Sequence, residues 1–163
     1  MSRRHSVGFA ALAAAMSLAA GLLLAGTLGG APPAWPQPPA DMLDPGLAVS
    51  YIHAYFRNVN DVAKSGPAKR GQPLGNLDHK TDSGRALTAD VSEGVGALIT
   101  GFIKLDKPGI YVFKVVSNDG VKLIIGGVLV HEDPGIHFDT MSPPVDLAVT
   151  EPGWYPVSVD YFQ

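Results

Sequence analysis

Five side chains that can bind a metal ion or hydrogen-bond a ligand fall within nine residues of this 163-residue chain. They are His131, Glu132, Asp133, His137 and Asp139. Imidazole and carboxylate groups together can form a transition-metal site, but their spacing here matches no zinc-binding pattern, and a Pro-Gly pair divides them. We therefore interpret this segment as a polar loop, and we expect His131, Asp133 and His137 to contact a ligand at its rim.

A second candidate site is the pair Asn118 and Asp119, which is followed by Gly120. A carboxylate and an amide carbonyl are oxygen ligands that calcium accepts, so the pair could hold a calcium ion, although more weakly than two aspartates would. The same three residues favour a tight turn, because Asn, Asp and Gly tolerate positive φ. Calcium is the one cofactor that the sequence suggests, and the plain turn is the competing interpretation.

Aromatic side chains supply a third kind of candidate, because their faces can stack on the apolar faces of sugars. We expect Tyr111 and Phe113 to be core residues, since aromatic residues in strands are usually buried. Trp154 follows a turn at Pro152-Gly153, where an exposed ring is credible. The predicted ligand-binding residues are therefore Asn118, Asp119, His131, Asp133, His137 and Trp154.

Several classes of function are disfavoured by the composition. The chain has no cysteine, which excludes disulfides, thiolate chemistry and a lipoprotein anchor. Its net charge of -3 is spread without a basic stripe, so nucleic-acid binding is not expected. No nucleophile elbow or phosphate-binding glycine loop occurs, and nothing pairs Glu151 with Asp160 as glycosidase acids. We predict that the protein is not an enzyme.

Short strands are the elements that must position these residues. Runs rich in β-branched and aromatic residues alternate with Gly, Pro, Asn and Asp turns, and helical periodicity is weak. The expected strands cover residues 47–56, 97–105, 110–117, 121–125, 128–130, 145–149 and 154–162. Asn118–Gly120 should join two of them as a hairpin, and Gly126-Gly127 should make a second tight turn. The predicted fold class is all-β, an antiparallel β-sandwich or barrel.

The N-terminal residues have the layout of an export signal. Arg3 and Arg4 precede an apolar run from Val7 to Leu28, and a Pro-rich stretch follows. We expect residues 1–30 to be a helical signal peptide or uncleaved signal anchor, and residues 31–45 a stiff linker. Export through the twin-arginine route or the general route stays open, and the destination is periplasmic, extracellular or membrane-anchored.

The region from residue 46 onward resembles the PA14 family, a β-barrel module of bacterial toxins, glycosidases and adhesins. The family's pattern is matched by residues 46–47, 51, 55–56, 101–103, 108–109, 111–113, 117–123 and 153–162. Asn118 departs from the pattern, because many members have an aspartate there that can help hold calcium. Gly126 replaces a family aspartate, and members usually continue past Tyr161-Phe162 into another strand.

What the resemblance implies is a PA14-like domain over residues 46–163 that acts as an exported, non-catalytic binding module. The expected ligand is a glycan or another cell-envelope component, bound by loops as in an adhesin. An accessory domain of a glycosidase is one alternative. Another is a structural or assembly protein, in which an open edge at the C-terminal strand pairs with a protein partner. Contact with a membrane is expected only through an uncleaved N-terminal segment.

Overall fold

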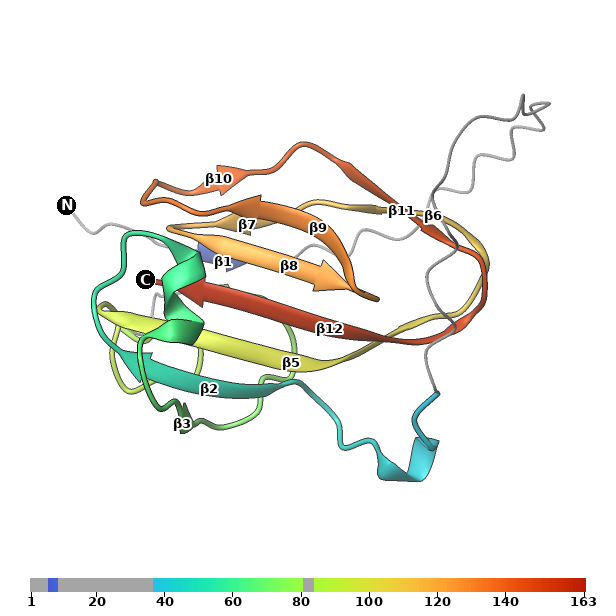
Figure 1. Cartoon of the computed structure of the whole chain (residues 1–163), viewed down its shortest axis with the longest axis horizontal. Helices are drawn as coiled ribbons and strands as arrows, with labels where there is room; N and C mark the ends of the chain where they lie inside the picture. The colour runs from blue at the N-terminus through green and yellow to red at the C-terminus, as the bar shows by residue number, and fades with distance from the viewer. Residues whose placement is uncertain (1–5, 9–36, 81–83) are drawn as a thin grey trace.

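The computed structural model describes residues 6–8, 37–80 and 84–163, which form antiparallel sheets and two short 3-10 helices (Figure 1). The predicted all-β fold is therefore confirmed. The helices are η1 (Ala40–Met42) and η2 (Val59–Lys64). The strands are β1 (Ser6–Gly8), β2 (Ala48–His53), β3 (Lys69–Arg70), β4 (Asp78–Lys80), β5 (Val95–Leu105), β6 (Gly109–Phe113), β7 (Val116–Ser117), β8 (Val121–Ile125), β9 (Val128–Asp133), β10 (Thr140–Met141), β11 (Val145–Val149) and β12 (Gly153–Phe162).

The main sheet has six strands in the order β3-β2-β5-β12-β8-β9. Its two longest strands, β5 and β12, pair from Gly96 opposite Phe162 to Leu105 opposite Gly153. The alternation expected for the last strand is confirmed, because Val157, Val159 and Tyr161 are all buried on its inner face. This sheet is thus the platform whose strand ends carry the loops.

The C-terminal strand lies in the centre of this sheet, which corrects the expectation of an open edge there. β12 pairs with β5 on one side and with β8 on the other (Figure 1). Both backbone edges of β12 are therefore paired from Val157 to Tyr161, so the C-terminal part of the strand offers no open edge. The assembly alternative fails in the form that placed a protein partner at the C-terminal edge.

The hairpin expected around Asn118–Gly120 is also wrong. The predicted strand 110–117 is split into β6, which pairs with β11, and β7, which pairs with β10 and β1. β8 pairs instead with β12 and β9. The turn is real, with Asp119 at a φ of 63°, but it carries the chain from one sheet to another. The second predicted turn is confirmed, since Ile125 pairs with Val128 across Gly126-Gly127.

Residues 57–80 and 84–94, which lie between β2 and β5, are tied to the core. Leu74, Ala86, Leu87 and Ala89 are buried in the main cluster of apolar side chains. The Tyr51 hydroxyl also bonds the Thr88 hydroxyl at 2.7 Å and accepts the Thr88 amide proton at 2.9 Å. The loop therefore closes one side of the domain.

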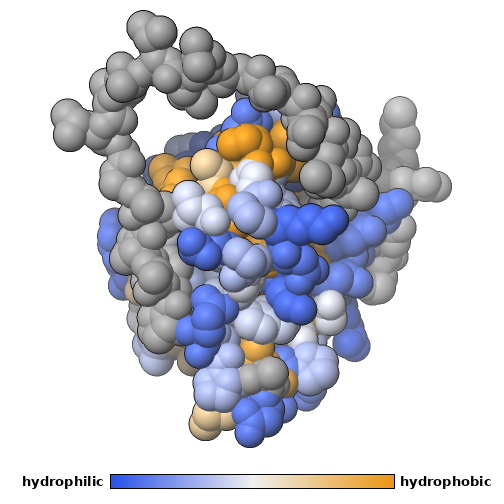
Figure 2. Space-filling view, turned by 90° about the vertical axis from the view of Figure 1, so that its right-hand side faces the viewer, coloured by the Kyte–Doolittle hydropathy of each residue, from blue (hydrophilic) through white to orange (hydrophobic). Residues whose placement is uncertain are grey.

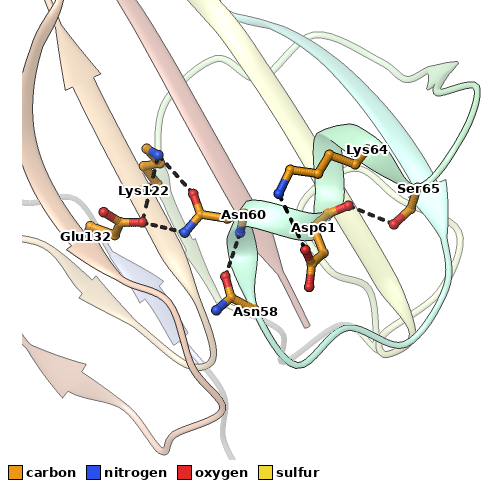
Figure 3. A network of polar contacts seen from close by, with 7 residues as sticks. All are labelled: Asn58, Asn60, Asp61, Lys64, Ser65, Lys122 and Glu132. Carbon is orange, nitrogen blue, oxygen red and sulfur yellow. Dashed lines mark hydrogen bonds and ion pairs between the residues drawn. The ribbon is translucent and has the colours of Figure 1, made fainter.

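The 3-10 helix η2 covers a second, smaller apolar cluster on the outer face of the main sheet. Val59 and Val62 pack there against Phe162, whose ring lies 6.1 Å from that of Phe56. Polar contacts also hold η2 against β8 and β9 (Figure 3). The Asn60 amide donates to Glu132 Oε1 at 2.6 Å, and Lys122 Nζ donates to Asn60 Oδ1 at 2.9 Å.

Most of the predicted signal segment lies outside the described residues; Ser6–Gly8 form β1, which pairs with β4 and β7. In the predicted linker, residues 37–45 are described and include η1. Gln37 Oε1 accepts the Trp154 amide proton at 2.7 Å, so this part of the linker contacts the domain. No helix in residues 6–8, 37–80 and 84–163 is long and apolar enough to span a membrane.

Candidate functional site

Two loops that the sequence offered as separate candidates meet at one end of the molecule. They are the β7–β8 turn with Asn118 and Asp119, and the β9–β10 loop with His137. The Asp119 amide donates to the His137 carbonyl at 3.0 Å, and the His137 amide donates to Asp119 Oδ1 at 3.2 Å. These reciprocal hydrogen bonds join the loops into one rim.

Asn118 helps to hold this rim in place. Its side chain is buried, and Oδ1 accepts a hydrogen bond from Gln163 Nε2 at 3.0 Å. Gln163 in turn accepts from the Tyr161 hydroxyl through Oε1. Burial raises the pKa of Tyr161, and the nearby carboxylates of Asp119 and Asp139 add to that rise. The phenol therefore keeps its proton, which it needs in order to donate here.

The oxygen atoms around Asn118 form a poor set of calcium ligands. Calcium takes six to eight oxygen ligands, usually from several carboxylates. Asn118 Oδ1 already accepts from Gln163, and Asp119 Oδ1 already accepts from the His137 amide. Within the described part of the chain, no three His, Asp or Glu side chains gather into a group that could hold a metal ion. The calcium site stays a prediction, and we derive no chemistry from it.

The predicted ligand residues His131, Asp133 and His137 lie close together beside the rim. His137 Nε2 lies 3.3 Å from Asp133 Oδ2, so the two form an ion pair when the ring is protonated, while Nδ1 is 2.9 Å from the Phe138 carbonyl oxygen. Burial lowers the pKa of His131; the Asp133 carboxylate opposes this shift and His137 reinforces it. His131 is therefore held toward its neutral form.

The β9–β10 loop also presents two apolar side chains that sequence reasoning did not select. Phe138 is 78% exposed and Ile136 is 63% exposed, and they alternate with His137 and Asp139. An aromatic ring beside imidazole and carboxylate groups is a usual composition for a small-ligand site. The sequence does contain a signal for Ile136 and Phe138: they are large apolar residues in an otherwise polar Pro-Gly loop, where no core requires them.

Trp154, which stays a predicted ligand-binding residue, lies far from this rim. It is the second residue of β12, whereas Phe162 ends that strand beside the rim, and eight extended residue steps span roughly 26 Å. Trp154 is half-buried and lines a groove of about 900 Å³ on the outer face of the main sheet, with Phe102, Pro156 and Ile124. Figure 2 shows the end where β12 begins as largely hydrophilic, with apolar residues gathered toward one side.

Comparison with known proteins places this arrangement among PA14 domains. Residues 76–163, more than half of the chain, match the family model of the PA14 domain. No curated protein matches the chain.

Solved structures share the fold at low sequence identity. An anti-sigma factor domain-containing protein aligns with a TM-score of 0.60 and 18% identity, over 74% of this chain but only 39% of its own. The PA14 domain of an antifreeze protein gives 0.53 and 18%, over 71% and 73% of the two chains. A PA14 sugar-binding domain from an RTX adhesin gives 0.51 and 19%, over 72% and 81%.

Proposed function

We propose that this chain, which belongs to the PA14 domain family, is an exported, non-catalytic module that binds a glycan or another cell-envelope ligand through its β7–β8 and β9–β10 loops. The observation that carries the proposal is the joining of these loops by the reciprocal hydrogen bonds between Asp119 and His137. A rim fixed in advance loses little conformational entropy when a ligand binds.

The chemistry of the rim supports a sugar as the ligand. The exposed Phe138 ring offers an apolar face for a pyranose ring, and Asp133 and Asp139, at the start and the end of the same segment, offer carboxylate oxygens. A structural neighbour that is a sugar-binding domain of an adhesin is in keeping with this class of ligand.

Positions of the acidic residues considered for catalysis support a non-catalytic role. Glu151 precedes β12, and Asp160 lies near its far end. The seven residue steps from Gly153 to Asp160 alone span roughly 23 Å, whereas the two carboxyl groups of a glycosidase lie about 5–10 Å apart. Beside a glycosidase, the domain would act as an accessory module that holds the substrate.

A glycan array probed with the purified full-length chain tests the proposal, first in calcium and then in EDTA. We expect one class of glycans to bind, and we expect Phe138→Ala to weaken binding about tenfold, the equivalent of one lost stacking contact. Tyr55→Ala is the matched control, because Tyr55 is an aromatic residue that is 85% exposed outside the rim. Loss of binding in EDTA would place a cation in the site.

Two results would refute the proposal. One is a folded chain that retains no glycan on the array. The other is equal glycan binding by the parent chain and Phe138→Ala, since the β9–β10 loop would then be uninvolved.

A further inference from the structure

The last part of β9 carries two of the predicted ligand residues, His131 and Asp133. In the part of the chain that the structure describes, β9 is the last strand of the main sheet, so the sheet pairs only one of its edges. The register with β8 shifts between Leu129 and His131, which leaves Val130 as an extra residue, a β-bulge. The bulge separates residues 131–133 from the rest of β9, and the sheet holds this segment from one side only.

The 3-10 helix η2 contacts this segment from the outer face of the sheet. The Asn60 amide donates to Glu132 Oε1 at 2.6 Å (Figure 3). Directly after β9, the Pro134 carbonyl oxygen accepts the Val59 amide proton at 2.9 Å. Two successive residues of η2 therefore bind the two chain neighbours of Asp133.

The other loop of the rim reaches the same place. Gly120, which follows Asp119 in the β7–β8 turn, accepts the Phe162 amide proton through its carbonyl at 3.1 Å, and the Phe162 side chain packs against Val59. A Cβ atom on Gly120 would lie 2.7 Å from the Pro134 carbonyl oxygen and closer still to the Phe162 ring, so a larger residue would force a shift. Both loops of the rim thus converge at the point where η2 is attached.

We propose that η2 sets the position of the ligand-binding rim, and that Asn60 and Gly120 are positioning residues for ligand binding, although neither belongs to the exposed part of the rim. Asn60 acts through Glu132, and Gly120 acts by letting the two loops approach each other. A rim that is supported in this way keeps its loops joined before a ligand arrives, which lowers the entropy lost on binding. The inference rests on the proposed function only for its effect on ligand affinity.

Amide hydrogen exchange at His137, followed by NMR on the full-length chain, tests the support without any ligand, because this amide donates to Asp119 Oδ1 across the two loops. Asn60→Ala should speed the exchange about tenfold, the effect of losing a hydrogen bond to a charged group. Tyr51→Phe is the matched control, since it removes the bonds between the Tyr51 hydroxyl and Thr88 in another part of the domain. Exchange at His137 in this control should stay within about twofold of the parent.

A double variant separates positioning from a general loss of stability. In Asn60→Asp with Glu132→Gln, the carboxylate and the amide trade places, so an amide can again donate to a carboxylate beside Lys122. Asn60→Asp alone sets two carboxylates against each other and should speed exchange at His137. The double variant should return it to within about twofold of the parent.

Gly120→Ala tests the second contact independently. Its added methyl group should displace the Pro134 carbonyl and speed exchange at His137. Gly75→Ala is the control, because a Cβ atom at Gly75 would meet nothing within 4 Å. Equal exchange in these two variants would overturn the role of Gly120.

The exchange results can overturn the proposal in three ways. These are parent-like exchange in Asn60→Ala, equal acceleration in Asn60→Ala and Tyr51→Phe, and a double variant that exchanges as fast as Asn60→Asp.

Ligand binding supplies the last arm. With a glycan selected on the array, Asn60→Ala should bind about tenfold more weakly than Tyr51→Phe, and equal affinities would overturn the positioning role in binding. If the folded parent binds no glycan, the proposed function fails, and the exchange experiments still decide whether η2 positions the two loops.

Discussion

Asn118 and Gln163 lie 45 positions apart in the sequence, yet their side chains form one buried hydrogen bond. Asn118, which the sequence predicts to bind a ligand, therefore also connects its loop to the C-terminal residue of the domain. Gln163 strengthens this connection through its backbone, which exchanges hydrogen bonds with Val95 at 2.9 and 3.1 Å. A side chain in this position contributes to the rim by holding it in place.

Asn118→Ala is expected to lower the free energy of unfolding by about 1–3 kcal/mol, because it leaves the amide of Gln163 buried without its partner. Chemical denaturation measures the loss. Ser65→Ala is the control: it removes an exposed hydrogen bond to the Asp61 carbonyl and should change stability by less than about 0.5 kcal/mol. Equal effects of the two variants would show that the Asn118 contact is solvated.

Asp160 should make stability depend on pH. Burial raises the pKa of Asp160, and the ammonium group of Lys122 partly opposes the rise. The folded state therefore binds this proton more tightly than the unfolded state. The resulting stabilisation is present below the ordinary carboxyl pKa of about 4, and it is lost as the pH rises through the raised value.

Asp160→Asn removes this proton-binding group. We expect the free energy of unfolding of the parent to fall, relative to Asp160→Asn, between about pH 4 and neutrality. Urea denaturation at a series of pH values measures the difference. Asp146→Asn, a matched change at an exposed strand position, should run parallel to the parent. A parent curve that rises relative to Asp160→Asn over this range would show that the direction is wrong.

Among the elements, η2 depends on a small number of contacts with the main sheet. Its apolar side pairs Val59 and Val62 with Phe162, and its polar side meets β8 and β9 through Asn60. The amide of Asn60 bonds both Lys122 and Glu132, which are half-buried and also form an ion pair with each other (Figure 3). One amide thus satisfies two charged groups on different strands.

Asn60→Ala is expected to lower stability by about 1.5–3 kcal/mol and to loosen η2, because two hydrogen bonds to charged groups are lost. Hydrogen exchange of the amides of residues 59–65 reports the loosening. Asp61→Asn, which breaks only an exposed ion pair with Lys64, should cost less than about 0.5 kcal/mol. If exchange is unchanged in Asn60→Ala, the apolar contacts alone hold the helix.

Most of the longer strands followed from local sequence patterns, whereas strand partners did not. The alternation of Val157, Val159 and Tyr161 predicted β12 and its buried face, but it contained no information on the two neighbours of the strand. The turn at Asp119 was likewise predicted, and its strands were paired wrongly because a turn fixes a change of direction and not a sheet. The burial of Val121 and Leu123 fits both the predicted hairpin and the observed sheet, so their pattern could not decide between the two.

For the candidate site, too, the sequence predicted local groups of residues and not the contacts between distant segments. His131, Asp133 and His137 are close in sequence, and the structure brings them together at the rim. Joining them to Asn118 and Asp119 required a contact between two loops. Placing Trp154 at the far end of β12 required the direction of a central strand. Both depend on the whole topology and on no local pattern.

At the scale of the whole molecule, the rim and the Trp154 groove are separate surfaces at the two ends of β12. Binding at one should therefore not respond to changes at the other. We expect Trp154→Ala to change the affinity for a rim ligand by less than about twofold, whereas Phe138→Ala lowers it about tenfold. Titration calorimetry with a glycan selected on the array measures both. A comparable loss in Trp154→Ala would mean that one ligand spans both surfaces.

The central place of β12 has a consequence for when the domain can fold. β12 is the last strand of the domain to be synthesised, and it joins β2 and β5 to β8 and β9. The main sheet therefore cannot close until residues 153–162 have been made and have reached it. Until then β2 with β5 and β8 with β9 are two separate groups of strands with exposed backbone edges, which is the condition in which strands can pair wrongly.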